Sequence, residues 1–217
     1  VIITTSTVPG EGKTFIAINT ADIYAMSGKK VLLVDFDLRK PRLEKCLDLD
    51  NELGLSTILT NRKTWQECLH KDVVENMDVI TSGPLTPIAA ELLIGKNIDT
   101  FISEVRNEYD IVILDTPPLG IIHDAITLSK YADNFFYVMR SGISVKGYIE
   151  YINGIVEEHG LKNVSMILNG LPASKHSSYG YSKYGYSNYG KYGYTEDEDD
   201  DNTGKGNFFS RLFGKKN

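Results

Sequence analysis

The residues best suited to chemistry lie near the start of the chain, at positions 6–14 (Ser-Thr-Val-Pro-Gly-Glu-Gly-Lys-Thr). Gly10 and Gly12 let backbone N–H groups approach phosphate oxygens, because no Cβ stands in the way. In such a loop Lys13 reaches the β- and γ-phosphates and the Thr14 hydroxyl ligates Mg²⁺. A helix that begins near Lys13 directs the positive end of its dipole at the anion. The stretch therefore predicts a phosphate-binding P-loop.

The flanking segments fit this prediction. A β-branched run at positions 1–5 leads into the loop, and a helix-compatible stretch at 15–26 leads out of it. The strict pattern G-x-x-x-x-G-K-[ST] is not met at its first position, so the motif is a relaxed one. The alternative is a glycine turn that precedes a helix starting with Lys-Thr.

A second segment places two acids at the end of a buried strand. Four consecutive apolar residues at 31–34 suit a parallel strand that is covered on both faces, and Asp35 and Asp37 follow them. Residues two apart in an extended chain point the same way, so we expect both carboxylates on one side. The carboxyl end of a parallel strand is where open α/β sheets bind ligands. The alternative is that each Asp caps the next turn.

A third segment, residues 109–118, is another apolar strand that ends in an acid, Asp115. Pro117 and Pro118 follow and forbid the strand to continue. This is the layout of a Walker B motif, in which Asp115 holds Mg²⁺ through a water, facing Thr14 across the phosphates. A P-loop and such a strand in one short chain reinforce each other and predict nucleotide binding.

The remaining pattern alternates strands with helices and predicts an α/β fold, a P-loop NTPase-like parallel sheet with helices on both faces. Asn169 ends the last strand; its amide either reads the adenine edge or starts a turn with Gly170. Asp124 is expected to cap a helix, and His123 beside it is expected to be incidental. Further strands are expected at 77–80, 135–140 and 164–170, and helices at 40–47, 89–93, 98–105, 124–131 and 145–158.

Composition limits the other possibilities. The chain has 217 residues, 41% of them hydrophobic, which suits one domain with an appendage. Its two cysteines form no metal-ligand pattern and suit a reducing compartment. No basic stripe stands out, so nucleic acid is not an expected partner. No membrane-spanning run or signal peptide is visible, and the chain starts in a strand without Met, as a piece of a longer protein does.

The composition changes after Pro172, so we expect a domain at 1–172 and a disordered tail at 173–217. Seven of the thirteen tyrosines alternate there with Gly, Ser and Lys. The tail is either a low-complexity spacer or a mobile string of phosphate acceptors; full modification would add roughly −10 to −14 charges. The tyrosines are Tyr179, Tyr181, Tyr184, Tyr186, Tyr189, Tyr192 and Tyr194.

Two charged segments follow the tyrosines. Residues 196–201 are all Asp or Glu, and residues 208–216 combine Phe and Leu with Arg and Lys. The acidic run is expected to be a solvated spacer. The basic, apolar end either touches an anionic membrane surface or remains an unstructured end.

Together these features resemble the bacterial tyrosine kinases (BY-kinases) that control capsule and exopolysaccharide export. The likeness comprises the loop at 6–14 as Walker A, the Val-Asp-Phe-Asp-Leu-Arg-Lys-Pro-Arg stretch as Walker A′, Leu-Asp-Thr-Pro-Pro as Walker B, and the tyrosine cluster. It implies an ATP- and Mg²⁺-dependent protein-tyrosine kinase that phosphorylates its own tyrosine cluster between chains. In this resemblance Asp35 activates the acceptor tyrosine, catalysis also uses Lys13 and Asp37, and Thr14, Asp37 and Asp115 form the metal site. The implied nucleotide-binding residues are Pro9, Gly10, Glu11, Gly12, Lys13, Thr14, Phe15 and Asn169.

The resemblance also implies partners and a location. The family assembles rings, acts with a membrane polysaccharide-export regulator and a tyrosine phosphatase, and lies at the cytoplasmic face of the inner membrane. Two features depart from the family. Its ring-forming Glu/Arg helix precedes Walker A, and this chain starts after that point. The stretch at 83–91 is also less proline-rich than similar family segments.

Two other functions are compatible with a P-loop. A positioning or partitioning ATPase of the deviant-Walker type would carry K-G-G-x-G-K-T, but Val8 stands at its first lysine and Pro9 at its first glycine. A nucleotide-gated scaffold whose tail is phosphorylated by another enzyme is the third possibility.

Overall fold

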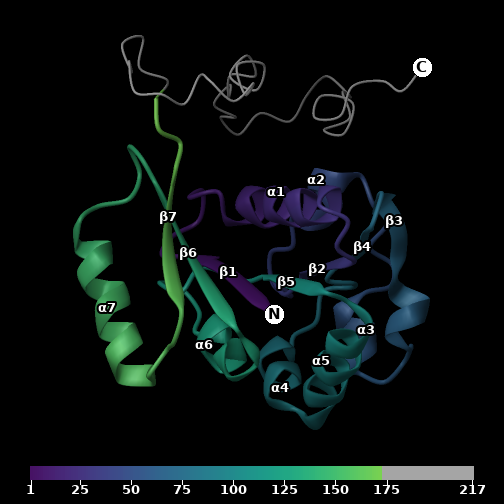
Figure 1. Cartoon of the computed structure of the whole chain (residues 1–217). Helices are drawn as coiled ribbons and strands as arrows, with labels where there is room; N and C mark the ends of the chain where they lie inside the picture. The colour runs from purple at the N-terminus through teal and green to yellow at the C-terminus, as the bar shows by residue number, and fades with distance from the viewer. Residues whose placement is uncertain (173–217) are drawn as a thin grey trace, which may run out of the picture.

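The computed structural model describes residues 1–172, and the predictions for the tail at 173–217 lie outside this part of the chain. The described residues form a seven-stranded sheet in the order β3-β4-β2-β5-β1-β6-β7 (Figure 1). All neighbouring pairs are parallel except β3 with β4, which is antiparallel. The predicted parallel α/β architecture is confirmed.

The strands agree closely with the predicted runs, apart from β3. They are β1 (Ile2–Ser6), β2 (Val31–Asp35), β3 (His70–Val74), β4 (Met77–Ile80), β5 (Ile111–Asp115), β6 (Asn134–Arg140) and β7 (Val164–Asn169).

Helices and short 3₁₀ turns connect the strands. They are α1 (Lys13–Met26), α2 (Leu43–Leu47), α3 (Leu55–Leu59), η1 (Trp65–Cys68), α4 (Ala89–Ile94), α5 (Lys96–Glu108), α6 (Asp124–Leu128), η2 (Ser129–Tyr131) and α7 (Gly147–His159).

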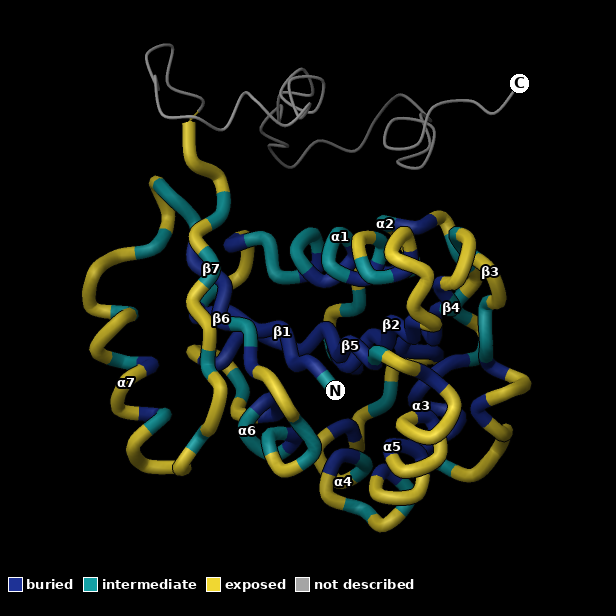
Figure 2. The backbone as a smooth tube through the Cα atoms, in the orientation of Figure 1, coloured by how far each residue is buried: buried dark blue, intermediate teal, exposed yellow. Residues whose placement is uncertain are grey.

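The sheet separates two apolar cores, and the alternation of side chains along each strand decides which core a residue joins. In β2, Val31 and Leu33 pack with α1 and α2, whereas Leu32 and Val34 pack on the opposite face. Strands β1 and β2 are buried throughout, β5 is buried after its first residue, and the outer helix faces are exposed (Figure 2). This double cover is why β2 and β5 read as continuous apolar runs.

Helix α1 can lie close to the sheet because its inner face is made of small residues. Ala17, Ala21 and Ala25 recur every fourth position and are at most 1% exposed. The helix ends before Gly28, which has a φ of +82°, in the left-handed region that favours glycine. This packing fixes the direction in which the helix N-terminus points, toward the carboxyl ends of β1 and β5.

Some expectations about local structure were wrong. Strand β2 ends at Asp35, so Asp37 lies beyond it and the extended spacing that was to align the two carboxylates does not apply. Asp124 does not cap α6; it is the first helical residue, and His123 holds the N-cap position without a side-chain hydrogen bond. Within residues 1–172 no helix is both long and apolar enough to cross a membrane.

Candidate active site

The loop between β1 and α1 has the backbone conformation that a P-loop requires. Gly10 and Gly12 have φ values of +86° and +92°, which a residue with a Cβ adopts only with strain. Gly12 is the N-cap of α1, so the first turn of the helix, from Lys13 on, presents free N–H groups. Pro9 and Gly10 form the exposed crest of the loop, and Phe15 lies in the first helical turn.

The Glu11 carboxylate braces this loop from inside the protein. The side chain is fully buried, and its Oε2 accepts hydrogen bonds from the backbone N–H groups of Thr7 (2.7 Å) and Val8 (2.8 Å). Its Oε1 accepts a hydrogen bond from the Ser144 hydroxyl. Because the carboxylate is turned inward, any contribution of Glu11 to phosphate binding comes from its backbone.

Asn169 lies directly against the loop. Its Nδ2 donates a hydrogen bond to the Glu11 carbonyl (3.1 Å), and its Oδ1 accepts one from the Gly170 N–H (2.8 Å). A Cβ added to Gly12 would stand 2.2 Å from the same Nδ2. The Asn169 amide is therefore part of the loop's support and also hydrogen-bonds to Gly170. Its expected contact with the adenine edge stays a prediction.

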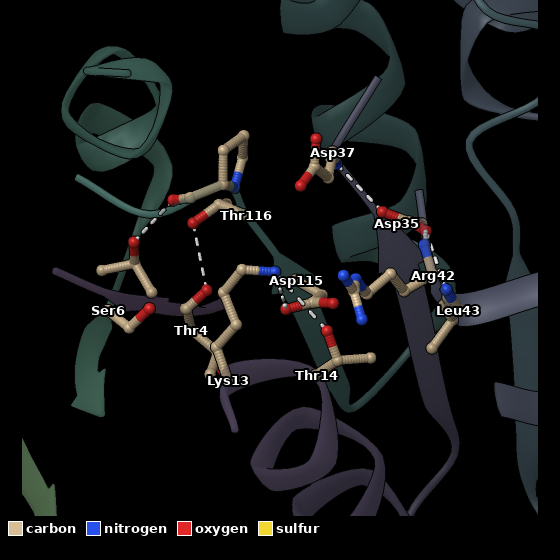
Figure 3. Close-up of polar contacts among 12 residues, drawn as sticks. Thr4, Ser6, Lys13, Thr14, Asp35, Asp37, Arg42, Leu43, Asp115 and Thr116 are labelled. Atoms are coloured by element: carbon tan, nitrogen blue, oxygen red, sulfur yellow. Dashed lines mark hydrogen bonds and ion pairs between the residues drawn. The ribbon is translucent and has the colours of Figure 1, made fainter. Parts of the chain in front are cut away.

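Lys13, Thr14 and Asp115 converge as the sequence predicted (Figure 3). The Lys13 Nζ lies 3.8 Å from Asp115 Oδ1 and 3.5 Å from the Thr14 hydroxyl. Asp115 is 1% exposed, and burial raises its pKa against the opposing effect of the Lys13 ammonium. A charged amine, a hydroxyl and a carboxylate thus meet at the N-terminus of α1.

Asp35 is the neighbour of Asp115 across the β2–β5 pair. It is 0% exposed, and its carboxylate accepts hydrogen bonds from the backbone N–H groups of Asp37 (2.9 Å), Leu43 (3.2 Å) and Arg42 (3.4 Å). Burial, with Asp115 as the next cause, raises the pKa of Asp35 to about 8. Two adjacent buried carboxylates therefore disfavour each other's charge.

Asp37 completes the acidic group at this edge of the sheet. Its Oδ1 accepts hydrogen bonds from the backbone N–H groups of Lys40 (2.9 Å) and Arg39 (3.3 Å). Arg39 in turn pairs with Asp124 at 3.5 Å. Burial raises the pKa of Asp124. No local pattern predicts this link between Arg39 and α6, because the two residues are 85 positions apart.

The residues present fit a bound nucleotide and a divalent cation. The Oδ1 atom of Asp115 is buried and accepts no hydrogen bond from the described residues, so an acceptor is left for a ligand. Within residues 1–172 no group of three or more His, Cys, Asp or Glu side chains could hold a metal ion by itself. Mg²⁺ is typically held by one or two carboxylates together with substrate phosphates, and the free Asp115 Oδ1 is a candidate for such a carboxylate oxygen.

Two further residues that the sequence did not indicate support the site. Arg140, at the end of β6, donates a hydrogen bond from Nη1 to the Gly10 carbonyl (3.0 Å). Thr116, which follows Asp115, donates its hydroxyl hydrogen to the Thr4 carbonyl (3.0 Å) and ties β5 to β1. Both contacts are long-range, so only the folded chain reveals them.

A glycine loop at a helix N-terminus, with acids from two neighbouring strands, defines a P-loop nucleotide-binding protein. The comparison with protein families agrees, since residues 1–161 match the model described as an AAA domain. The septum site-determining protein MinD of Pyrococcus horikoshii shares the fold, with a TM-score of 0.66 and 22% identity over 80% of this chain and 71% of that one.

Relatives with higher sequence identity show to which family of P-loop proteins the chain belongs. The chain is 38% identical over 180 residues to the tyrosine-protein kinase YwqD of Bacillus subtilis, covering 83% of this chain and 76% of that protein. It is 30% identical to the tyrosine-protein kinase Wzc of Salmonella typhimurium, covering 83% of this chain and 26% of that protein. The solved chimerical protein CapA2B2 matches with a TM-score of 0.75 and 37% identity, covering 79% of this chain and 76% of that one. The chain belongs to the bacterial tyrosine-protein kinase family, which confirms the expected protein-tyrosine kinase.

Proposed function

We propose that this kinase transfers the γ-phosphate of ATP, with Mg²⁺, to the tyrosines at 179–194 of a neighbouring copy. The observation that carries the proposal is the convergence of Lys13, Thr14 and Asp115 beside the acidic pair Asp35 and Asp37. The first three residues can bind a triphosphate with its metal ion. A carboxylate of the acidic pair can receive the proton of an attacking hydroxyl.

The first half of the chemistry is electrostatic. Lys13 and the N–H groups at the start of α1 bind the negatively charged phosphates of ATP. They neutralise the charge that spreads over the phosphoryl group during its transfer. Mg²⁺ supplies further positive charge at the phosphates when it is bound. Thr14 and Asp115, with Asp37 beside them, are the residues that hold it. Pro9, Gly10, Gly12 and Phe15 shape the loop, and Asn169 keeps it in place.

The second half is the activation of the acceptor. Asp35 takes or orients the phenol proton, since a carboxyl with a pKa of about 8 is close to the pH at which a general base is most effective. Its carboxylate is buried and held by backbone N–H groups of residues 37–43. Access for a tyrosine therefore requires this segment to shift when the acceptor binds.

The acceptor is the tail. We propose that residues 1–172 form the kinase domain, that 173–217 is a separate mobile segment, and that its seven tyrosines are the phosphorylation sites. Each phosphate adds about −1.5 to −2 charges, so successive phosphorylation makes neighbouring tails repel one another. Such repulsion would break contacts between copies and so regulate the synthesis and export of exopolysaccharide or capsule.

The wider setting follows from the same family resemblance. The proposed partners are further copies in a ring-like assembly, a membrane polysaccharide-export regulator and a tyrosine phosphatase. The proposed location is the cytoplasmic face of the bacterial inner membrane.

One experiment separates this proposal from a simple ATPase and from a scaffold. The purified, phosphatase-treated chain is incubated with Mg²⁺ and ATP, and both ADP and phosphotyrosine are measured. We expect equal amounts of the two, and loss of both in Lys13→Met. In Asp35→Asn, with folding checked by circular dichroism, phosphotyrosine should fall by at least tenfold while nucleotide still binds.

Two other results would contradict the proposal. Release of ADP without phosphotyrosine would indicate a positioning or partitioning ATPase that transfers phosphate only to water. Phosphotyrosine that persists in Lys13→Met would indicate that another enzyme phosphorylates the tail.

A further inference from the structure

A hollow of about 590 Å³ opens beside the acidic pair, and its lining is basic. Lys40, Arg42 and Lys45 line it and are exposed, and their side chains form no ion pair with a described residue. Arg39 lines it as well but is paired with Asp124. Glu44 is the one acid among the lining residues. We refer to this feature as the basic hollow.

The basic hollow is directly connected to the site. The backbone N–H of Lys40 donates to Asp37 Oδ1 at 2.9 Å, and that of Arg42 donates to Asp35 Oδ2 at 3.4 Å. Lys45 lies on the short helix α2, which begins one residue after Arg42. A ligand in the hollow therefore lies next to the segment at 37–43 that covers the Asp35 carboxylate.

The sequence contains a ligand of opposite charge at a matching position. All six residues at 196–201 are acidic, and the run begins two residues after Tyr194, the last tyrosine of the cluster. The rest of the tail contains no other Asp or Glu. We infer that the basic hollow binds the acidic run of a second copy of this chain and thereby presents its last tyrosines to the active site. The inference rests on the proposed function and names how its acceptor is selected.

The spacing is suitable for this role. An extended chain advances about 3.3 Å per residue, so Tyr194 lies about 7 Å and Tyr192 about 13 Å ahead of the acidic run. Helix α2, with five residues, is about 7.5 Å long. When the acidic run is bound in the hollow, Tyr192 and Tyr194 are therefore the first tyrosines to reach the active site. Tyr179 reaches it only if the intervening chain folds back on itself.

The lining also suits a tyrosine-bearing peptide. Pro41 and Leu85 give the hollow an apolar wall, and the Leu85 side chain is 68% exposed. An aromatic ring that packs there removes apolar surface from water while the acids pair with the lysines. Charge complementarity of this kind acts mainly on encounter rate and specificity, and it weakens as salt is added.

The test uses full-length chains in two roles. The acceptor carries Lys13→Met, so it supplies tyrosines but cannot transfer phosphate. The enzyme carries Phe at all seven cluster tyrosines and Asn or Gln throughout 196–201, so its own tail neither accepts phosphate nor competes for the hollow. The measured quantity is kcat/KM for phosphotyrosine on the acceptor at low salt, with sites mapped by mass spectrometry.

The expected results form a double-mutant cycle between the acidic run of the acceptor and the lysines of the enzyme's hollow. Replacing the acids of the acceptor's run by Asn and Gln should lower kcat/KM about tenfold and abolish the early phosphorylation of Tyr192 and Tyr194. Lys40→Glu with Lys45→Glu in the enzyme should give a similar loss toward the native run, and no further loss toward the neutral one. An acceptor whose run is changed to lysine should recover activity with the charge-reversed enzyme. Lys71→Glu with Lys162→Glu, exposed lysines outside the hollow, is the matched control and should change nothing.

Each other outcome has a distinct meaning. Equal rates on native and neutral runs, or losses that simply multiply, would overturn the inference and leave the proposed function intact. Faster transfer when the run is neutral would show that the run inhibits rather than recruits. Absence of phosphotyrosine on every acceptor would overturn the proposed function and this inference with it.

Discussion

Asp115 is a buried carboxylate with one oxygen left for a ligand. It lies between Thr4 of β1 and Asp35 of β2 in the sheet register, and its Oδ1 accepts no hydrogen bond from the described residues. The Lys13 ammonium, 3.8 Å away, and a hydrogen bond from the Thr14 side chain both favour its charged form. Burial and the neighbouring carboxylates disfavour the ionised form of Asp115, and a bound cation would relieve this unfavourable electrostatic energy.

These charges predict how stability depends on pH. Both Asp35 and Asp115 have raised pKa values, so their ionised forms destabilise the fold increasingly as pH rises from about 4 to about 8. Asp115→Asn removes one titrating group and lowers the pKa of the other. When the pH is raised from about 6 to about 8, the Tm of ligand-free Asp115→Asn should therefore fall by about 2–4 °C less than the Tm of the ligand-free wild type. Thermal unfolding measured by circular dichroism at the two pH values tests this, and parallel curves would contradict it.

A second prediction concerns steric and backbone strain at Gly12. Gly12→Ala places a Cβ 2.2 Å from Asn169 Nδ2 and forces alanine into a φ of +92°. Strain of about 1–3 kcal/mol should lower Tm by several degrees and weaken ATP binding. Adding Asn169→Ala relieves the contact but not the backbone strain, so the double variant should regain part of the loss. If the two single effects merely add, the contact plays no part.

At the scale of elements, the P-loop is held by the segment that joins β6 to α7. Ser144 donates to Glu11, its hydroxyl accepts the Arg140 N–H at 2.7 Å, and Arg140 donates to the Gly10 carbonyl. The conformation of the loop therefore depends on an element more than a hundred residues away in the sequence. This bracing explains how a loop with an exposed crest keeps its N–H groups oriented toward a ligand.

The brace can be tested at Glu11. Glu11→Ala leaves the buried Thr7 N–H without an acceptor, which costs about 1–3 kcal/mol. We expect Tm to fall by several degrees and the Kd for ATP, measured by calorimetry, to rise. Glu11→Gln is the control: it keeps an acceptor for Thr7 and Val8 and still hydrogen-bonds to Ser144, so it should behave almost as the wild type. Equal losses in both variants would mean that charge, not hydrogen bonding, maintains the loop.

The contrast between predicted and observed elements has a physical reason. Strands β2 and β5 were predictable because burial on both faces requires uninterrupted apolar runs, and the P-loop because few other sequences allow phosphate contact. Strand β3 was missed, since His70–Val74 is an edge strand with a polar sequence whose pairing with β4 gives no periodic signal. The supports from Arg140 and Ser144, and the true direction of Glu11, depend on tertiary contacts that no local pattern encodes.

At the scale of the whole molecule, charge is unevenly distributed. The chain carries a net charge of −6, yet its last segment collects six consecutive acids after seven tyrosines. The basic hollow lies beside the acidic pair at the carboxyl edge of the sheet. If the tail is the acceptor, as proposed, these opposite charges would favour phosphorylation of a second copy over hydrolysis of ATP by water.

The central claim is that this chain phosphorylates the tyrosines of its own sequence. The most direct measurement is mass spectrometry of the phosphatase-treated full-length chain before and after incubation with Mg²⁺ and ATP, with Lys13→Met treated in parallel. We predict phosphate on tyrosines within 179–194, Tyr192 and Tyr194 first, and none in Lys13→Met alone. A wild-type chain that consumes ATP while this segment stays unmodified would contradict the account.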